Sequence, residues 1–138
     1  MCLNSATAAL ELVLRVLDIG EGDEVIVPAM TYTASCSVIY HVGAKAVIVD
    51  IQKDGHEMDY EALENAITEK TKAVIPVDLA GIPCDYDKIF EVVNAKKSLF
   101  KANSEYQEKL GRIAVVADGA HALGSVYKGV KVGAVADF

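Results

Sequence analysis

Four short apolar runs recur along this chain, and they constrain its fold more than any other feature. Residues 23–28, 45–50, 72–77 and 112–118 each contain a continuous stretch rich in Val, Ile and Ala. Strands with one face in water alternate apolar and polar residues, whereas strands covered on both faces are continuously apolar. The runs therefore predict a mostly parallel sheet that is covered by helices on both faces.

Helical patterns separate the apolar runs. The expected helices are residues 6–17, 33–42, 59–67 and 85–110. Asp59 and Asp85 are predicted N-caps of the third and fourth helices, and the polar stretch 96–109 of the fourth is predicted to be a surface extension. The alternation of strands and helices predicts the α/β class, as a three-layer α/β/α arrangement with right-handed crossovers.

Composition and charge limit the kind of protein. The chain has 138 residues, of which 52% are hydrophobic and 24% charged, so we expect one folded domain. The net charge of −7 argues against a nucleic-acid partner, and the lysines near 96–101 are predicted to be a solvated face. Cys2, Cys36 and Cys84 have no paired spacing, which predicts reduced thiols, a cytoplasmic location and no metal site. Polar residues interrupt the apolar stretch 3–17, so no signal peptide or membrane span is predicted.

Polar or aromatic residues follow the carboxyl ends of three runs. Tyr32 comes shortly after the first run, and Asp78 and Asp118 end the third and fourth. Ligand sites of open α/β sheets lie at these ends, so these three side chains are predicted to share one rim. The chain contains neither GxGxxG nor GxxxxGK[ST], which argues against a generic nucleotide-binding domain.

The first predicted helix begins with small and hydroxyl residues, Ser5, Ala6 and Thr7. Free backbone N–H groups and the positive end of the helix dipole make such a turn an anion site, to which the two hydroxyls would add donors. The alternative is that Ser5 is an ordinary N-cap.

Asp118 ends a run predicted to be buried, and a buried carboxylate is unfavourable unless it is paired. A cationic ring nitrogen is one possible partner, because the acid would keep the ring protonated and electron-withdrawing. The alternative is an Asp that caps the next turn. His121 is placed to orient this acid or to touch a ring, or it is a structural histidine. Tyr32 is placed to stack on a flat ligand, or it packs against the protein.

Several longer motifs occur in a fixed order along the chain. They are residues 4–10 (NSATAAL), 22–28 (GDEVIVP), 31–35 (TYTAS), 43–50 (GAKAVIVD), 66–77 (AITEKTKAVIPV), 81–85 (GIPCD), 118–124 (DGAHALG), 127–129 (YKG) and Gly133. Together they resemble the DegT/DnrJ/EryC1/StrS family of nucleotide-sugar aminotransferases of fold type I. The resemblance covers nearly the whole chain.

The resemblance implies pyridoxal 5′-phosphate as cofactor. The Ala6 N–H and the Thr7 hydroxyl would hold its phosphate, in the helix that starts at Ser5, and Tyr32 would stack on its ring. Asp118 would pair with the ring nitrogen. His121, three residues on, would lie beside the ring oxygen. The implied reaction moves an amino group from an amino acid, usually glutamate, to a keto sugar linked to a nucleotide, in a homodimer whose sites the second subunit completes.

The chain departs from the family pattern in several respects, of which three matter most here. Relatives often have His at the position of Asp78, and the stretch 96–109 looks like an insertion. The family's Schiff-base lysine lies in a Ser-Phe-x-x-x-Lys motif that would fall after Phe138. We therefore expect residues 1–138 to be part of the large cofactor-binding domain, without the small domain.

The resemblance also leaves other functions open. A sugar dehydratase on the same scaffold, with His in place of the lysine, is one alternative, and a non-catalytic truncated product is another. We expect the 138 residues alone not to transaminate. We also expect an uncovered sheet edge and apolar face, which dimerisation would cover.

Overall fold

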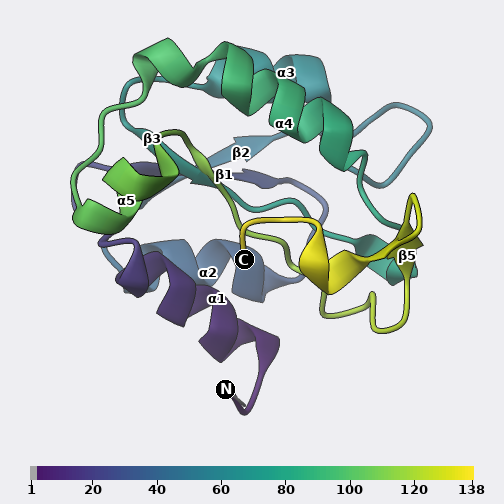
Figure 1. The fold of residues 1–138 in the computed structure, drawn as a ribbon. Helices are drawn as coiled ribbons and strands as arrows, with labels where there is room; N and C mark the ends of the chain where they lie inside the picture. Colours follow the sequence, from purple (N-terminus) through teal and green to yellow (C-terminus); the bar gives the residue numbers. More distant parts are fainter. Residues whose placement is uncertain (1–2) are drawn as a thin grey trace.

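The structure is a computed structural model that describes residues 3–138. Helices lie on both sides of a central sheet, which confirms the predicted three-layer α/β/α architecture (Figure 1). The α-helices are α1 (Ala6–Val16), α2 (Thr33–His41), α3 (Tyr60–Ala66), α4 (Tyr86–Ala95) and α5 (Glu105–Leu110). The strands are β1 (Glu24–Pro28), β2 (Lys45–Val49), β3 (Thr71–Val74), β4 (Ala114–Val115), β5 (Val126–Tyr127) and β6 (Val130–Lys131). Single 3₁₀ turns are η1 (Leu79–Gly81), η2 (Lys97–Leu99) and η3 (Val132–Ala134).

The main sheet has the strand order β2-β1-β3-β4, and every neighbouring pair is parallel. The third and fourth strands are shorter than predicted, because Pro76 has no N–H to continue the ladder. Pairing resumes once, at a parallel bridge between Val77 and Asp118, where Asp118 N–H donates to the Pro76 carbonyl at 2.8 Å. This bridge holds the ends of the third and fourth runs side by side.

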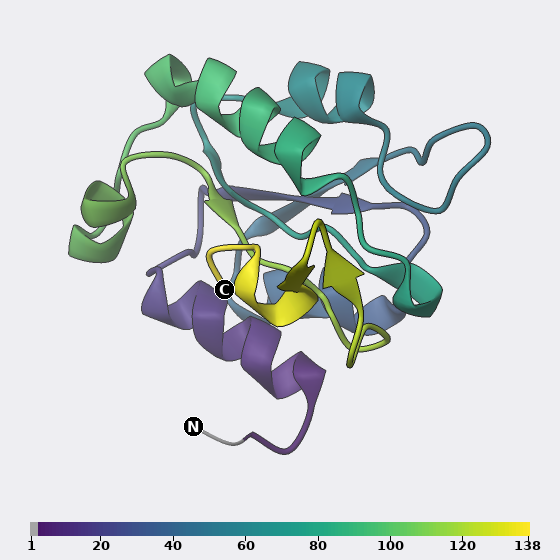
Figure 2. The ribbon, with the colours of Figure 1, turned by 45° about the vertical axis from the view of Figure 1, so that its right-hand side comes forward.

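Each face of the sheet has its own core. Leu10 and Leu14 of α1 and Val38 of α2 pack on one face. Leu63 of α3 and Ile89 of α4 pack on the other face, which Figure 2 shows above the strands. Strands β1, β3 and β4 are therefore buried on both faces, as their continuous apolar runs predicted. Strand β2 lies at the edge of the sheet, and its Lys45 and Ile48 are exposed, which the continuous run 45–50 did not predict.

The prediction of one long fourth helix was wrong. The chain forms α4, the short turn η2 and a separate helix α5, which Ser104 caps by accepting from Gln107 N–H at 3.3 Å. The surface-extension interpretation was also wrong in part, because Gln107 is buried and its Nε2 donates to the Leu17 carbonyl at 2.7 Å. The Ser104-x-x-Gln107 spacing is a helix-start signature that predicts this break.

Two further features bear on the sequence predictions. Cys36 and Cys84 are free thiols, as expected, whereas Cys2 lies outside the described residues. The backbone of residues 137–138 runs along the edge of β4, where Asp137 N–H donates to the Val115 carbonyl at 3.1 Å, so part of that edge is covered. Among residues 3–138, no helix is long and apolar enough to cross a membrane.

Candidate functional site

A small hollow at the carboxyl end of the sheet brings together side chains from three different connections. Tyr32 lies between β1 and α2, Asp78 follows β3, and Asp118 and His121 follow β4. All four line the hollow, together with Val77, Leu79 and Ala120. The predicted rim therefore exists, and it includes His121.

The Asp118 carboxylate is the buried acid of this hollow, with 7% of the residue exposed. Its Oδ2 accepts from Ser35 Oγ at 2.6 Å, and its Oδ1 accepts from Ala120 N–H at 3.2 Å. The second contact is the turn-capping role left open by the sequence. No Lys, Arg or His in the described part of the chain forms an ion pair with Asp118, so its contacts are all with neutral donors.

Ser35 is a site residue to which the sequence analysis assigned no role. It lies in the first turn of α2, is wholly buried, and contacts both Thr31 and Asp118. A signal was present, since a hydroxyl residue one helical turn after a strand-end aromatic points back towards the rim. That signal names no partner, because Asp118 is 83 positions away in sequence.

Tyr32 is the most open member of the hollow. It is the N-cap residue of α2, in extended conformation, and its side chain makes no capping bond. The residue is 75% exposed, so its ring is free to meet a ligand rather than packed in the core. Within the described residues, this tyrosine therefore packs against little of the protein.

His121 contacts the backbone rather than the acid. Its exposed ring accepts from Ala80 N–H through Nδ1 at 3.4 Å, and no hydrogen bond joins it to Asp118. An imidazole that accepts at Nδ1 carries its proton on Nε2 when neutral. Ala80 has a φ of 55°, an unusual value for a residue with a Cβ, and Gly81 follows at 80°. A Cβ at Gly81 would lie 3.3 Å from the His121 carbonyl oxygen, a tight contact, so this contact and the positive φ both favour glycine here.

Asp78 lines the hollow, but its carboxylate is already engaged. Oδ1 accepts from Cys84 N–H at 2.9 Å and Oδ2 accepts from Tyr86 Oη at 2.8 Å. Burial raises the pKa of Asp78, against the effect of these two donors. Asp78 thus ties the end of β3 to the start of α4, and we assign it a structural role.

The start of α1 is the one predicted element that does not line the hollow. Ser5 Oγ accepts from Ala8 N–H at 3.1 Å, which is the ordinary N-cap of the alternative interpretation. Ala6 and Thr7 occupy the first turn, where backbone N–H groups have no partner within the helix. Helix α1 packs beside α2, the helix that carries Tyr32 and Ser35 at its start (Figure 1).

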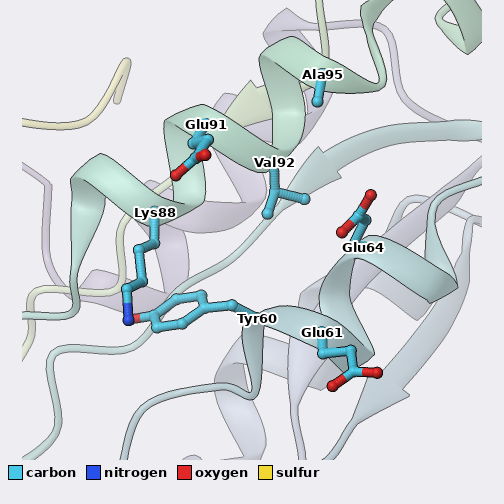
Figure 3. Close-up of a pocket in the computed structure, with 7 residues that line it drawn as sticks. All are labelled: Tyr60, Glu61, Glu64, Lys88, Glu91, Val92 and Ala95. Atoms are coloured by element: carbon cyan, nitrogen blue, oxygen red, sulfur yellow. The ribbon is translucent and has the colours of Figure 1, made fainter.

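A larger pocket lies elsewhere, in the groove between α3 and α4 (Figure 3). It has a volume of about 380 Å³, against about 20 Å³ for the hollow, and three glutamates line it: Glu61, Glu64 and Glu91. Lys88 Nζ lies over the Tyr60 ring at 5.4 Å from its centroid. This groove contains none of the predicted site residues, and its charged side chains face solvent. We therefore choose the smaller hollow as the candidate site, because it contains the predicted residues and a buried acid.

The chain is similar to known proteins over nearly its whole length. The putative sugar aminotransferase Spr1654 from Streptococcus pneumoniae, solved in its PLP-form and PMP-form, is 67% identical, with a TM-score of 0.98. It is matched over 99% of this chain and 34–35% of its own. The uncharacterized protein MJ1066 from Methanocaldococcus jannaschii is 44% identical, over 98% of this chain and 31% of its own length. The chain thus spans about a third of the length of these relatives.

A likeness of fold alone extends further. GDP-4-keto-6-deoxymannose-3-dehydratase superposes with a TM-score of 0.75 at 24% identity, over 93% of this chain and 31% of its own.

The family pattern of the DegT/DnrJ/EryC1/StrS aminotransferases matches residues 1–138, the whole of the sequence. This match covers the start of α1, the Tyr32 segment and the Asp118 turn together, and the chain therefore belongs to the DegT/DnrJ/EryC1/StrS aminotransferase family.

Proposed function

We propose that this chain is the cofactor-binding part of a pyridoxal-phosphate-dependent aminotransferase. In this proposal the protein moves an amino group from an amino acid, glutamate in the first instance, to a keto sugar linked to a nucleotide. The observation that carries the proposal is the Asp118 carboxylate, which is buried at the rim and contacts only neutral donors. The similarity to Spr1654, solved in PLP-form and PMP-form, supports the same cofactor.

The residues present fit pyridoxal phosphate by their chemistry. A buried carboxylate without a cation suits a protonated pyridine nitrogen, because the two charges would offset each other's desolvation. The exposed Tyr32 ring suits the flat face of a pyridine. The first turn of α1, with Ser5, Ala6 and Thr7, suits a phosphate.

Each group of the chain would have a defined task. Asp118 would accept a hydrogen bond from the ring nitrogen and keep it protonated. Tyr32 would hold the plane of the ring, and the N–H groups of Ala6 and Thr7 with the Thr7 and Ser5 hydroxyls would hold the phosphate. His121, whose Nδ1 accepts from Ala80 N–H, would have its Nε2–H available for the ring oxygen. When bound, the cofactor would supply two things, a ring that withdraws electrons and a carbon that carries the amino group between donor and acceptor.

The Schiff-base lysine is not assigned to a residue of this segment. No lysine lines the hollow within residues 3–138, and none lies in the family motif. We propose that residues 1–138 form part of the large cofactor-binding domain and that the 138 residues alone do not transaminate.

We also propose a cytoplasmic homodimer in which the second subunit completes the site, consistent with the open Tyr32 ring and the fully exposed Leu123. Light scattering on the full chain, which here means residues 1–138 together with the rest of the proposed aminotransferase, tests the dimer, and a clean monomer at micromolar concentration would contradict it.

A half-reaction tests the proposed activity. The full chain is loaded with pyridoxal phosphate and mixed with glutamate, without a sugar. We expect the visible absorbance of the cofactor to disappear with one equivalent of 2-oxoglutarate per site, and a nucleotide-linked keto sugar to restore it. A protein that binds the cofactor but converts no common amino acid to its 2-oxo acid would contradict the proposal.

The dehydratase is the alternative within the same fold. Amine transfer is favoured because Spr1654 is 67% identical, whereas the dehydratase is 24% identical and shares the fold alone. The two functions differ in the step with the sugar, since a dehydratase would consume its keto sugar without leaving the amino group on the product.

A further inference from the structure

A chain of two hydroxyl groups leads into the Asp118 carboxylate. Thr31 Oγ1 lies 2.7 Å from Ser35 Oγ, and Ser35 Oγ lies 2.6 Å from Asp118 Oδ2. Ser35 is wholly buried, so water does not compete for its hydroxyl. The other contacts of these hydroxyls, both to the Tyr32 carbonyl, are longer, at 3.3 Å and 3.4 Å.

The charge of the acid determines the direction of this chain. An ionised carboxylate can only accept, and a serine hydroxyl has one hydrogen to donate. Ser35 therefore donates to Asp118, and Thr31 donates to Ser35.

These contacts leave the acid with a defined orientation. Ser35 occupies one acceptor position on Oδ2, and Ala120 N–H occupies one on Oδ1, while the carboxylate lines the hollow. A carboxylate has about four acceptor positions, so others stay free for a donor. Fixing both oxygens in this way removes rotation that a ligand would otherwise have to stop.

We propose that Ser35 is the positioning residue for Asp118, with Thr31 supporting it from behind. The proposal rests on the function proposed above. Thr31 and Ser35 flank Tyr32, so one short segment both presents the stacking ring and sets the acid that meets the ring nitrogen. This segment thereby couples two parts of the site that come from strands β1 and β4 of the sheet.

The test is a set of variants of the full chain, titrated with pyridoxal phosphate and followed by absorbance. We expect Ser35→Ala to weaken cofactor binding about 10- to 100-fold, the range for one hydrogen bond to a charged group. Thr31→Val, which removes the second hydroxyl at constant shape, should weaken it about threefold to tenfold. Ser37→Ala is the matched control, because Ser37 lies on the same helix and its Oγ bonds only to the Ala34 carbonyl, at 3.3 Å.

A second readout separates positioning from a structural role. The pH at which the bound cofactor changes its absorbance should move in Ser35→Ala and Thr31→Val and stay fixed in Ser37→Ala. A loss of stability alone would not move it. Ser35→Ala with binding and pH transition equal to those of Ser37→Ala would overturn the proposal.

The remaining outcomes are equally defined. If Ser35→Ala does not fold, Thr31→Val decides, and a Thr31→Val protein that matches the wild type in both readouts overturns the hydroxyl chain. A wild-type protein that does not bind pyridoxal phosphate would instead contradict the proposed function.

Discussion

The two ends of the same sheet bury their charges in opposite ways. At the amino end, Lys72 Nζ lies 3.9 Å from Asp23 and Lys45 Nζ lies 3.0 Å from Glu24, so each buried acid has a cation. At the carboxyl end, the described residues give Asp78 and Asp118 hydroxyl and backbone donors but no cation.

This difference separates a structural cluster from a binding site. Where an acid is buried for stability, the protein itself supplies the cation beside it, because an uncompensated buried charge destabilises the fold. In a binding site, the ligand can instead supply the opposite charge. Both oxygens of Asp78 accept from donors near the start of α4, Cys84 N–H and Tyr86 Oη, whereas Asp118 faces the hollow with acceptor positions free. Asp118 is therefore the acid that a cationic ligand would pair with.

The largest expected effect comes from removing the charge at the carboxyl end. Asp118→Asn should weaken binding of pyridoxal phosphate by about 3 to 5 kcal/mol, since the ring nitrogen loses its counter-charge. The fold should persist, because the carboxamide oxygen can still accept from Ala120 N–H. A spectroscopic titration measures this, with Asp23→Asn as the control at the other end. Similar affinities for Asp118→Asn and Asp23→Asn would break the comparison.

The next effect is on stability at the amino end. Lys72→Met should lower the free energy of unfolding by about 3 kcal/mol, because it leaves the Asp23 carboxylate buried without its cation. Urea unfolding measures it, and Lys72→Met with Asp23→Asn should recover part of the loss. Cofactor affinity should stay within about twofold of wild type, and a parallel loss of affinity would show that the two ends are not independent.

A pH dependence should distinguish Asp78 from a paired acid. Burial raises the pKa of Asp78 in the folded protein, so the folded state holds this proton to higher pH than the unfolded state. Its contribution to stability is therefore present below the unfolded pKa and is lost as pH rises through the folded pKa. Asp78→Asn removes this loss while keeping partners for Cys84 N–H and Tyr86.

The variant should gain stability relative to wild type as the pH rises above the ordinary range of an aspartate. Unfolding measured from pH 4 to pH 7 tests this expectation. A variant that instead loses stability relative to the wild type as the pH rises would indicate that Asp78 is stabilised as a carboxylate.

The smallest effect compares two helix caps. Ser5→Ala and Ser104→Ala should each lower the free energy of unfolding by about 1 kcal/mol, because each serine caps a helix. Only Ser5→Ala should also weaken the binding of pyridoxal phosphate, by a few-fold, since Ser5 begins the proposed phosphate turn. Equal affinities in the two variants would remove Ser5 from the site.

Local patterns predicted much of this molecule. The continuous apolar runs gave the sheet and its two covered faces, and Asp59 caps α3 by accepting from Ala62 N–H at 2.8 Å, as expected. The rim positions of Tyr32, Asp78 and Asp118 followed from strand direction. These features depend on spacing within one element or on the rule for parallel sheets.

Features that depend on distant contacts were not predictable in this way. Ser35, the partner of Asp118, lies 83 positions away in sequence, and Gln107 donates a hydrogen bond to Leu17, which lies 90 positions away.

Some local conformations were not predictable either. The Lys128–Gly129 turn of the β5–β6 hairpin has two positive φ angles, 48° and 86°, but only the glycine suggests this from sequence. His121 lies in the same hollow as Asp118, but the alternative in which it orients this acid is not observed, because its hydrogen bond is to Ala80, whose conformation no local pattern indicated.

The central claim is that the buried Asp118 carboxylate, at the carboxyl end of the sheet, pairs with a protonated ring nitrogen of the cofactor. One measurement tests this claim most directly. The full chain is loaded with pyridoxal phosphate labelled with ¹⁵N in the ring, and the ring nitrogen is observed by NMR. We expect a protonated nitrogen in the wild type near neutral pH and an unprotonated one in Asp118→Asn. A ring nitrogen in the same state in both proteins would contradict the account.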